Sequence, residues 1–245
     1  MIRSLLFHAA FYLATMLIML FALPLLFAPR SWVIWAWKLH ARIVVGLLRV
    51  IAGIGIEVRG RERLPEGGCI VAAKHQSAWD TIAPMAYLRA PCVIIKQELM
   101  RIPLYGQFAR KMGMIPVRRE RGAVALRDMA RAARSRAAEA RQIFIFPEGT
   151  RRAPGAAPDY KPGVVMLYEA LDVPCVPLAL NSGLYWPRHA WRLRPGTIVM
   201  EFLEPIPPGL PRDEFRRRLI EATETATARL LAEGRAHGEM SENAA

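Results

Sequence analysis

A histidine and an aspartate five positions apart, His75 and Asp80, form the first pair in the chain whose side chains could do catalysis. His75 ends an apolar run over residues 69–75, and open α/β sheets place their functional groups at such strand ends. A carboxylate on one imidazole nitrogen fixes the tautomer, which leaves the other nitrogen free to take a proton from a hydroxyl group. We therefore consider the pair a candidate catalytic dyad.

The spacing of the pair restricts the local structure. On a regular helix the two side chains would point about 140° apart, so contact requires His75 in a turn and Asp80 in the first helical turn. A strand, a turn and a helix in succession supply that geometry. The alternative is a capping box formed by Ser77 and Asp80, which would explain both residues without catalysis.

A second group of candidate residues follows the apolar run that begins at Gln142. The run ends in Pro147, Glu148, Gly149, Thr150 and Arg151. A glycine that can take positive φ, beside a hydroxyl and a guanidinium group, is typical of a backbone-and-arginine anion site. A charged turn after a buried strand is the alternative. Residues 113–119 form a third strand end, which closes with Arg118 and Arg119.

Positioning these groups together requires a sheet, and the pattern after Gly60 predicts one. Strands are expected over 69–75, 92–99, 113–119, 142–149, 175–181 and 197–206, and helices over 78–90, 99–111, 121–141, 162–171 and 211–233. This alternation predicts an α/β fold with a largely parallel mixed sheet flanked by helices. Parallel strands end at the same edge of a sheet, which would bring the three groups together.

The first 30 residues contain one long apolar run instead of short strands and helices. No charged residue lies between Arg3 and Arg30, and residues 5–27 are long enough to cross a bilayer. A cleaved signal peptide is the alternative, but the run exceeds the usual apolar core of such peptides and Leu26 disfavours a cleavage site ending at Ala28. We expect an uncleaved anchor, which either spans the bilayer or enters one leaflet.

A second apolar stretch covers residues 31–56. Its charged residues Lys38, Arg42 and Arg49 fall within about 40° of one another on a helix. This pattern predicts a helix in the membrane interface, with Trp32, Trp35 and Trp37 at headgroup depth. A core helix with one polar stripe is the alternative. The expected organisation is membrane-anchoring helices over 1–55, an α/β domain over 56–234 and a disordered tail over 235–245.

Charge and missing motifs narrow the function. The net charge is +13, and only five of the 34 basic residues are lysines, a composition suited to phosphates or anionic headgroups. Nucleic acid would share this preference, but the arginine-rich run 121–141 has no aromatic residue on which bases could stack, so no nucleic-acid partner is expected. The three cysteines form no CxxC pair, and His75 and Asp80 have no further ligand types nearby, so no metal is expected.

The order of these motifs resembles that of the 1-acyl-sn-glycerol-3-phosphate acyltransferases, the PlsC type of glycerolipid acyltransferase, from about residue 55 to 210. His75 and Asp80 match the family's HX4D motif, and the resemblance implies that they act as general base and orienting acid. Residues 146–151 match its FPEGTR motif. The resemblance implies substrate binding by Glu148, Gly149, Thr150 and Arg151.

Two further motifs carry the resemblance. Residues 113–119 resemble the second motif and imply that Arg119 contacts phosphate, although Pro116 and Arg118 depart from the commoner residues there. Lys96 stands where the family has a basic residue and implies a further phosphate ligand. Residues 173–178 resemble the fourth motif, which is associated with the acyl side of the site. Lys74 replaces the commoner asparagine before the histidine.

The resemblance implies a membrane-associated enzyme. It would transfer a fatty acyl group from acyl-CoA or acyl carrier protein to the sn-2 hydroxyl of lysophosphatidic acid, giving phosphatidic acid, with no metal or redox cofactor. In a bacterium it would lie at the inner membrane with its catalytic domain on the cytoplasmic side. The alternatives are another lysolipid acceptor, such as lyso-ornithine lipid, and a non-catalytic membrane protein that binds anionic lipid and has no use for a paired His75 and Asp80.

Overall fold

The computed structural model of the chain describes residues 1–118, 122–188 and 190–243, and the side chains of these residues up to 236. The described strands form one sheet: β1 (Ile54–Arg59), β2 (Cys69–Ala73), β3 (Pro91–Lys96), β4 (Ile115–Val117), β5 (Gln142–Ile145), β6 (Cys175–Leu180) and β7 (Gly196–Phe202). The described α-helices are α1 (Ile2–Phe21), α2 (Arg30–Leu47), α3 (Tyr105–Met112), α4 (Gly122–Ala138), α5 (Gly163–Leu171) and α6 (Arg212–Asn243).

The sheet is largely parallel, as predicted. Its strand order is β1-β7-β6-β2-β5-β3-β4, and of these neighbours only β6 and β7 are antiparallel. The strands β6, β2, β5, β3 and β4 therefore all end at one edge. The register pairs Ala72 with Ile145 and Lys96 with Val117, so the residues that follow β2 and β5, and those that follow β3 and β4, come out side by side.

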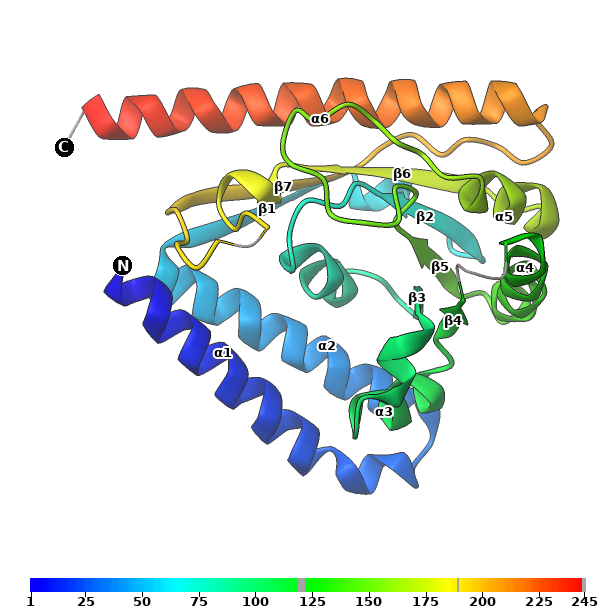
Figure 1. Cartoon of the computed structure of the whole chain (residues 1–245), viewed down its shortest axis with the longest axis horizontal. Coiled ribbons are helices and arrows are strands. Elements are labelled where there is room, and N and C mark those ends of the chain that lie inside the picture. The colour runs from blue at the N-terminus through cyan, green and yellow to red at the C-terminus, as the bar shows by residue number, and fades with distance from the viewer. Residues whose placement is uncertain (119–121, 189, 244–245) are drawn as a thin grey trace.

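Helices cover both faces of the sheet (Figure 1). The helices α1 and α2 lie on one face, and α6 lies on the other with α4 and α5. Successive residues of β2 point to opposite faces, as in any strand. Val71 and Ala73 belong to the apolar cluster on the side of α2, whereas Ile70 and Ala72 belong to the cluster on the side of α4 and α5. Burial on both faces explains why the strand sequence is almost continuously apolar.

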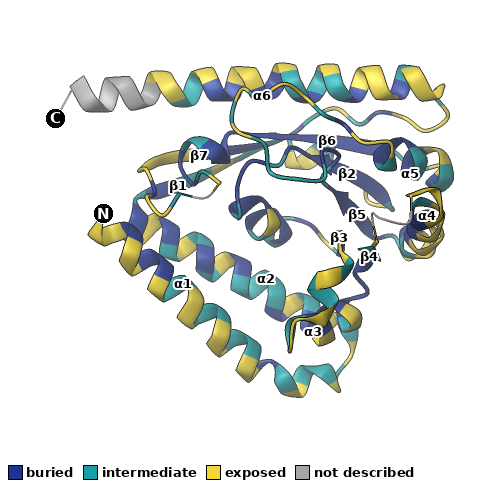
Figure 2. Cartoon of the chain, viewed as in Figure 1, coloured by how far each residue is buried: buried dark blue, intermediate teal, exposed yellow. Residues whose placement is uncertain are grey.

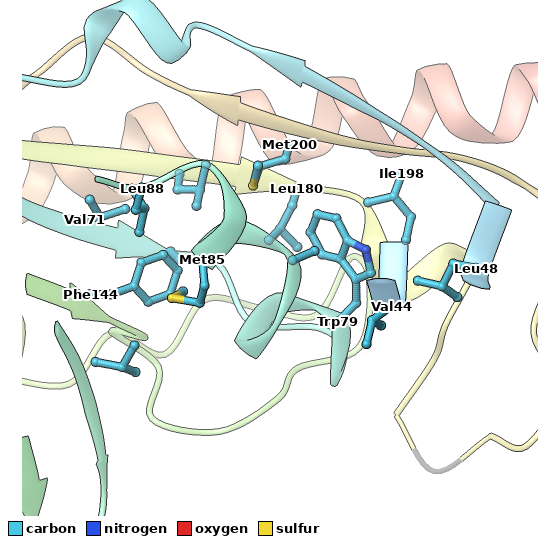
Figure 3. Packing of buried hydrophobic residues seen from close by; sticks show 14 of the residues in the cluster. Val44, Leu48, Val71, Trp79, Met85, Leu88, Phe144, Leu180, Ile198 and Met200 are labelled. Carbon is cyan, nitrogen blue, oxygen red and sulfur yellow. The ribbon is translucent and has the colours of Figure 1, made fainter. Parts of the chain in front are cut away.

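The turn after His75 is anchored in the larger of these clusters. Trp79 is fully buried there with Val44 of α2, Leu48 just after α2 and Ile198 of β7, as Figure 3 shows. Burying a side chain of this size removes a large apolar surface from water and stabilises the fold. The segment between His75 and Asp80 is therefore held against α2 and the sheet.

Two expected helices are shorter and more irregular than predicted. Residues 78–90 form two short 3₁₀ turns, Trp79–Thr81 and Ala83–Ala86, because Pro84 lacks the N–H group that a continuous helix would need. The helix expected over 99–111 is a 3₁₀ turn, Gln97–Arg101, followed by α3. Pro103 separates the two, since the residue before a proline disfavours helical geometry.

The first strand, β1, begins inside the range for which the sequence predicts a helix. The predicted helix over 31–56 ends earlier, because α2 stops at Leu47 and the π turn after it stops at Gly53, whose φ is 69°. Ile54 begins β1, which pairs with β7 in parallel. The expected boundary between residues 55 and 56 thus falls inside a strand of the sheet.

The last helix is longer than predicted. Instead of ending near residue 233, α6 continues to Asn243, through most of the range 235–245 for which a disordered tail was expected. Residues 235–243 include Arg, Ala, Glu and Met, which favour a helix once one has begun.

The N-terminal helix presents an apolar face to solvent. By length and composition α1 could cross a membrane, and much of it is exposed, as the yellow segments of the α1 ribbon in Figure 2 show. Trp32 and Trp35 at the start of α2 are each 58% exposed. Trp37 instead packs against the core, because two residues along a helix turn it about 200° from Trp35. The expectation that all three lie at headgroup depth is therefore not supported for Trp37.

Candidate active site

The structure brings His75 and Asp80 together as the spacing requires. His75 lies in the turn after β2, and its Nδ1–H donates to Oδ2 of Asp80 at 3.0 Å. The Asp80 carboxylate is fully buried, whereas the His75 side chain is 12% exposed. With Nδ1 engaged as a donor, Nε2 is the unprotonated nitrogen of the neutral ring, and it has no protein hydrogen-bond partner among the described residues. This geometry leaves a base at the surface of the site.

Asp80 accepts hydrogen bonds on both carboxylate oxygens. The backbone N–H groups of Gln76 and Ser77 donate to Oδ2 at 2.6 and 2.7 Å, and the Ser182 hydroxyl donates to Oδ1 at 2.5 Å. Together with His75 these make four donors, which is the environment of an ionised carboxylate. The negative charge fixes the imidazole and would stabilise an imidazolium.

The capping alternative is partly correct. Ser77 donates its N–H to Asp80, and the Ser77 hydroxyl accepts from the N–H of Trp79 at 3.1 Å. Asp80 therefore closes the turn and contacts His75 with the same carboxylate oxygen. The two interpretations do not exclude each other, because one group does both.

The FPEGTR segment packs directly against the histidine. Phe146 stacks on the His75 ring with centroids 3.9 Å apart, and the N–H of Arg152 donates to the His75 carbonyl oxygen at 2.8 Å. β2 and β5 are parallel neighbours in the sheet, so the segments that follow them lie next to each other. The stacked ring restricts rotation of the imidazole and keeps Nε2 in one direction.

Residues 147–151, where the sequence predicts an anion site, follow β5. Gly149 has a φ of 67°, a conformation that glycine adopts without strain, and its N–H donates to the Phe146 carbonyl. The Arg151 carbonyl accepts from the Arg188 guanidinium at 2.8 Å. Thr150 and Arg151 are partly exposed, and the Arg151 guanidinium has no ion-pair partner among the described residues. Arg151 is one residue before Arg152, whose backbone N–H contacts the turn that holds His75.

Glu148 occupies a different position from its neighbours. It is buried, and its Oε1 accepts from the Lys74 ammonium at 3.0 Å. Lys74 also donates to Glu224 of α6 at 2.8 Å, and the Tyr160 hydroxyl donates to the same Glu224 oxygen. Burial raises the pKa of the Glu148 carboxyl, while the Lys74 charge opposes that shift. In this geometry one Glu148 oxygen joins the turn to Lys74, and direct contact with substrate stays a prediction.

Comparison with known proteins agrees with this geometry. The family model described as Acyltransferase matches residues 55–181, which is more than half of the chain. The chain belongs to the acyltransferase family. The fold of this acyltransferase is also that of a solved relative, the 1-acyl-sn-glycerophosphate (LPA) acyltransferase PlsC from Thermotoga maritima. The TM-score is 0.77 at 23% identity, over 94% of this chain and 97% of that one.

Curated relatives carry a more specific name. The 1-acyl-sn-glycerol-3-phosphate acyltransferase of Pseudomonas aeruginosa is 34% identical over 157 residues, 64% of this chain and 61% of that protein. The human 1-acyl-sn-glycerol-3-phosphate acyltransferase alpha is 29% identical over 177 residues, 71% of this chain and 62% of that protein. The chain thus aligns with about three fifths of the length of these relatives.

Another predicted residue of the acyltransferase, Lys96, lies farther along the same edge. Lys96 is exposed at the end of β3, the strand next to β5, and faces Val117 of β4 in the register. Strands stand about 4.8 Å apart, so this position is two strands from the end of β2. Arg119 lies outside the described residues.

Two residues of the site were not predicted from the sequence. Ser182, which binds Asp80, is 102 positions away in the chain, and the N–H of Gly183 donates to the Gln76 amide oxygen. Both follow β6, which is the other neighbour of β2. The signal that could have found them is the parallel pairing itself, since it brings the end of β6 beside the turn that holds His75.

Proposed function

We propose that this chain is a membrane-associated acyltransferase that acylates the sn-2 hydroxyl of lysophosphatidic acid and so gives phosphatidic acid. The donor is a fatty acyl thioester, acyl-CoA or acyl carrier protein. The observation that carries the proposal is the His75–Asp80 pair at a strand end, with Phe146 of the FPEGTR segment stacked on the His75 ring. The names of the curated relatives point to the same acceptor.

The pair supports direct transfer without an acyl-enzyme. His75 Nε2 takes the proton of the acceptor hydroxyl, and the oxygen attacks the thioester carbonyl carbon. When the tetrahedral intermediate collapses, the C–S bond breaks and the imidazolium returns its proton to the departing thiolate. Asp80 stays ionised and holds the ring throughout. A positioned base contributes about 10²- to 10⁴-fold, and alignment of the two substrates contributes the rest.

The acceptor's phosphate is proposed to lie against the basic strand ends. Arg151 follows β5 and Lys96 ends β3, its neighbour, so both can approach one phosphate group from the same edge. A guanidinium group binds two phosphate oxygens at once, and the partly exposed Thr150 hydroxyl, beside Gly149, would add a further donor. Arg119 is proposed as an additional phosphate ligand.

Membrane association is proposed from the N-terminal helices. The exposed apolar face of α1 would cost free energy in water and gain it in lipid, where both acyl chains reside. The proposed location is a membrane, and in a bacterium the cytoplasmic side of the inner membrane, where thioester donors are present.

An acceptor panel with the purified full chain tests the function. Labelled acyl-CoA and acyl carrier protein are each supplied with lysophosphatidic acid, lyso-ornithine lipid or lysophosphatidylcholine, and the products are separated by chromatography. The expected product is phosphatidic acid, and His75→Ala should lose it by at least about 10²-fold. Acylation of lyso-ornithine lipid alone would reassign the acceptor. Lipid binding without any product would favour the non-catalytic alternative.

A further inference from the structure

The segment after Ser182 connects the active site to the N-terminal helix. We call residues 182–188 and 190–194 the docking loop. At the start of the loop, the Ser182 hydroxyl donates to Asp80. Farther along, the Arg188 guanidinium donates to the Arg151 carbonyl oxygen in the FPEGTR turn. The loop then leaves the sheet edge before β7 begins at Gly196.

The far end of the docking loop is fixed to the first turns of α1. The Ser4 hydroxyl accepts from the N–H of Leu193 at 3.0 Å, and the His8 ring donates from Nε2 to the Trp191 carbonyl at 3.1 Å. Trp186 is buried edge-on against Phe7, with ring centroids 5.3 Å apart. The position of the loop relative to α1 is therefore set by polar and apolar contacts together.

The side chains of the loop that stay exposed to solvent near α1 are one aromatic and two basic ones. Trp191 is 67% exposed although its backbone is held, and its ring reaches the edge of the His8 ring. Arg192 and Arg194 are exposed and have no ion-pair partner among the described residues. Neither α1 nor the docking loop contains an acidic residue. A large aromatic side chain and two guanidinium groups are therefore exposed within four positions of the chain, next to the first turns of α1.

The exposed Trp191 continues the apolar face of α1. Leu5 and Tyr12 are three positions before and four positions after His8, so they flank it on the helix, and they are 56% and 61% exposed. Trp191 lies against His8 and extends this face beyond the helix. Figure 2 shows exposed residues along α1 and on the loop beside its N-terminal end.

We propose that the docking loop is a second lipid-contacting element, remote in sequence from the N-terminal helices. Trp191 inserts at headgroup depth, and Arg192 and Arg194 bind the phosphate groups of anionic lipids. Tryptophan favours this depth because its ring is apolar and its N–H is polar, and guanidinium groups are attracted to an anionic leaflet. The proposal rests on the proposed membrane association, and it commits to a lipid surface as the partner.

A single fluorescent label tests the proposal. The native thiols at Cys69, Cys92 and Cys175 are buried, and burial raises the pKa of Cys69 to about 12 and of Cys92 to about 11, so an introduced exposed cysteine reacts selectively. Trp191→Cys is labelled with an environment-sensitive dye, and the full chain is reconstituted in phosphatidylcholine vesicles with or without phosphatidylglycerol. The matched control is Thr225→Cys, an exposed position of α6 on the other face of the sheet.

The expected result is a blue-shifted emission at position 191 that is quenched by lipids carrying a nitroxide near the headgroup, more strongly with phosphatidylglycerol present. Adding Arg192→Gln and Arg194→Gln, or about 0.5 M salt, should reduce that difference at least twofold. Label at position 225 should report water throughout. Water-like emission at position 191 in both vesicle types overturns the proposal, as does a shift only on addition of acyl carrier protein. Acyl transfer by the wild-type chain is measured separately, so loss of the proposed function and loss of the loop contact are distinguishable.

Discussion

The Ser182 hydroxyl donates to the buried carboxylate of Asp80 at 2.5 Å, which ties the end of β6 to the turn that holds His75. Ser182 is itself fully buried. Because Asp80 orients His75, the hydroxyl acts on the base through the carboxylate and is a positioning group. The relationship also connects the docking loop to the catalytic pair through a single hydrogen bond.

Ser182→Ala should lower kcat while leaving the fold intact. A hydrogen bond to a charged group contributes about 1.5–3 kcal/mol, and tenfold in rate corresponds to about 1.4 kcal/mol, so we expect a fall of roughly 10- to 100-fold. Steady-state kinetics should show the loss in kcat, with KM for the acyl thioester unchanged. Thr227→Val is the matched control, since it removes another buried hydroxyl, one with no hydrogen-bond partner among the described residues. Equal kcat in the two variants would contradict a positioning role.

Asp80→Asn separates the two tasks of that carboxylate. An asparagine oxygen can still accept from the N–H groups of Gln76 and Ser77, so the turn should survive with a stability loss of about 1–2 kcal/mol. The amide cannot stabilise an imidazolium, so activity should fall by at least about 10²-fold. Thermal unfolding measures the loss of stability, and kcat/KM measures the loss of activity. Asp128→Asn, at an exposed carboxylate of α4, controls for the loss of one charge.

The contact between His75 and Asp80 and the position of the FPEGTR turn could be predicted because their signals are local. Each follows an apolar strand within a few residues, and alternation of strands and helices implied that the strand ends meet. The structure gives His75 and Phe146 in contact for that reason. The parallel sheet was predicted on the same grounds.

Contacts between distant segments could not be predicted in this way. Ser182 and Glu224 reach the site only because β6 lies beside β2 and α6 crosses the sheet, and no local pattern encodes either fact. β1 was missed because its residues continue the apolar composition of α2, and only Gly53 marks the change. The ion pair of Glu148 with Lys74 could not be predicted either, because the two residues follow different strands.

The Lys74–Glu148 ion pair predicts a pH-dependent stability. Burial raises the pKa of Glu148, so the ionised carboxyl costs the fold free energy at any pH above that folded value, and Lys74 offsets the cost. Lys74→Met removes the offset and raises the pKa of Glu148 further. Breaking a buried pair costs about 3–5 kcal/mol, and the loss should grow as pH rises because the fold then holds an unpaired charge.

Thermal unfolding at about pH 5.5 and about pH 8 checks this sign. The difference in Tm between the wild type and Lys74→Met should be larger at the higher pH. The double variant Lys74→Met with Glu148→Gln carries no charge at either position, so its difference from the wild type should vary less with pH. A Tm difference that shrinks as pH rises would show that Glu148 is not the group responsible.

Arg151→Lys tests the proposed division between the two substrates. An ammonium keeps the positive charge but loses the guanidinium fork that binds two phosphate oxygens, so kcat/KM for lysophosphatidic acid should fall by about tenfold or more. If the arginine binds ground state and transition state alike, the change appears as a raised KM with kcat retained, whereas a lower kcat means that it also aligns the hydroxyl with His75. Arg217→Lys, on the exposed surface of α6, is the matched control. Unchanged acceptor kinetics together with a raised KM for acyl-CoA would place Arg151 on the donor's phosphates, and the two substrate sites would then exchange places around the same base.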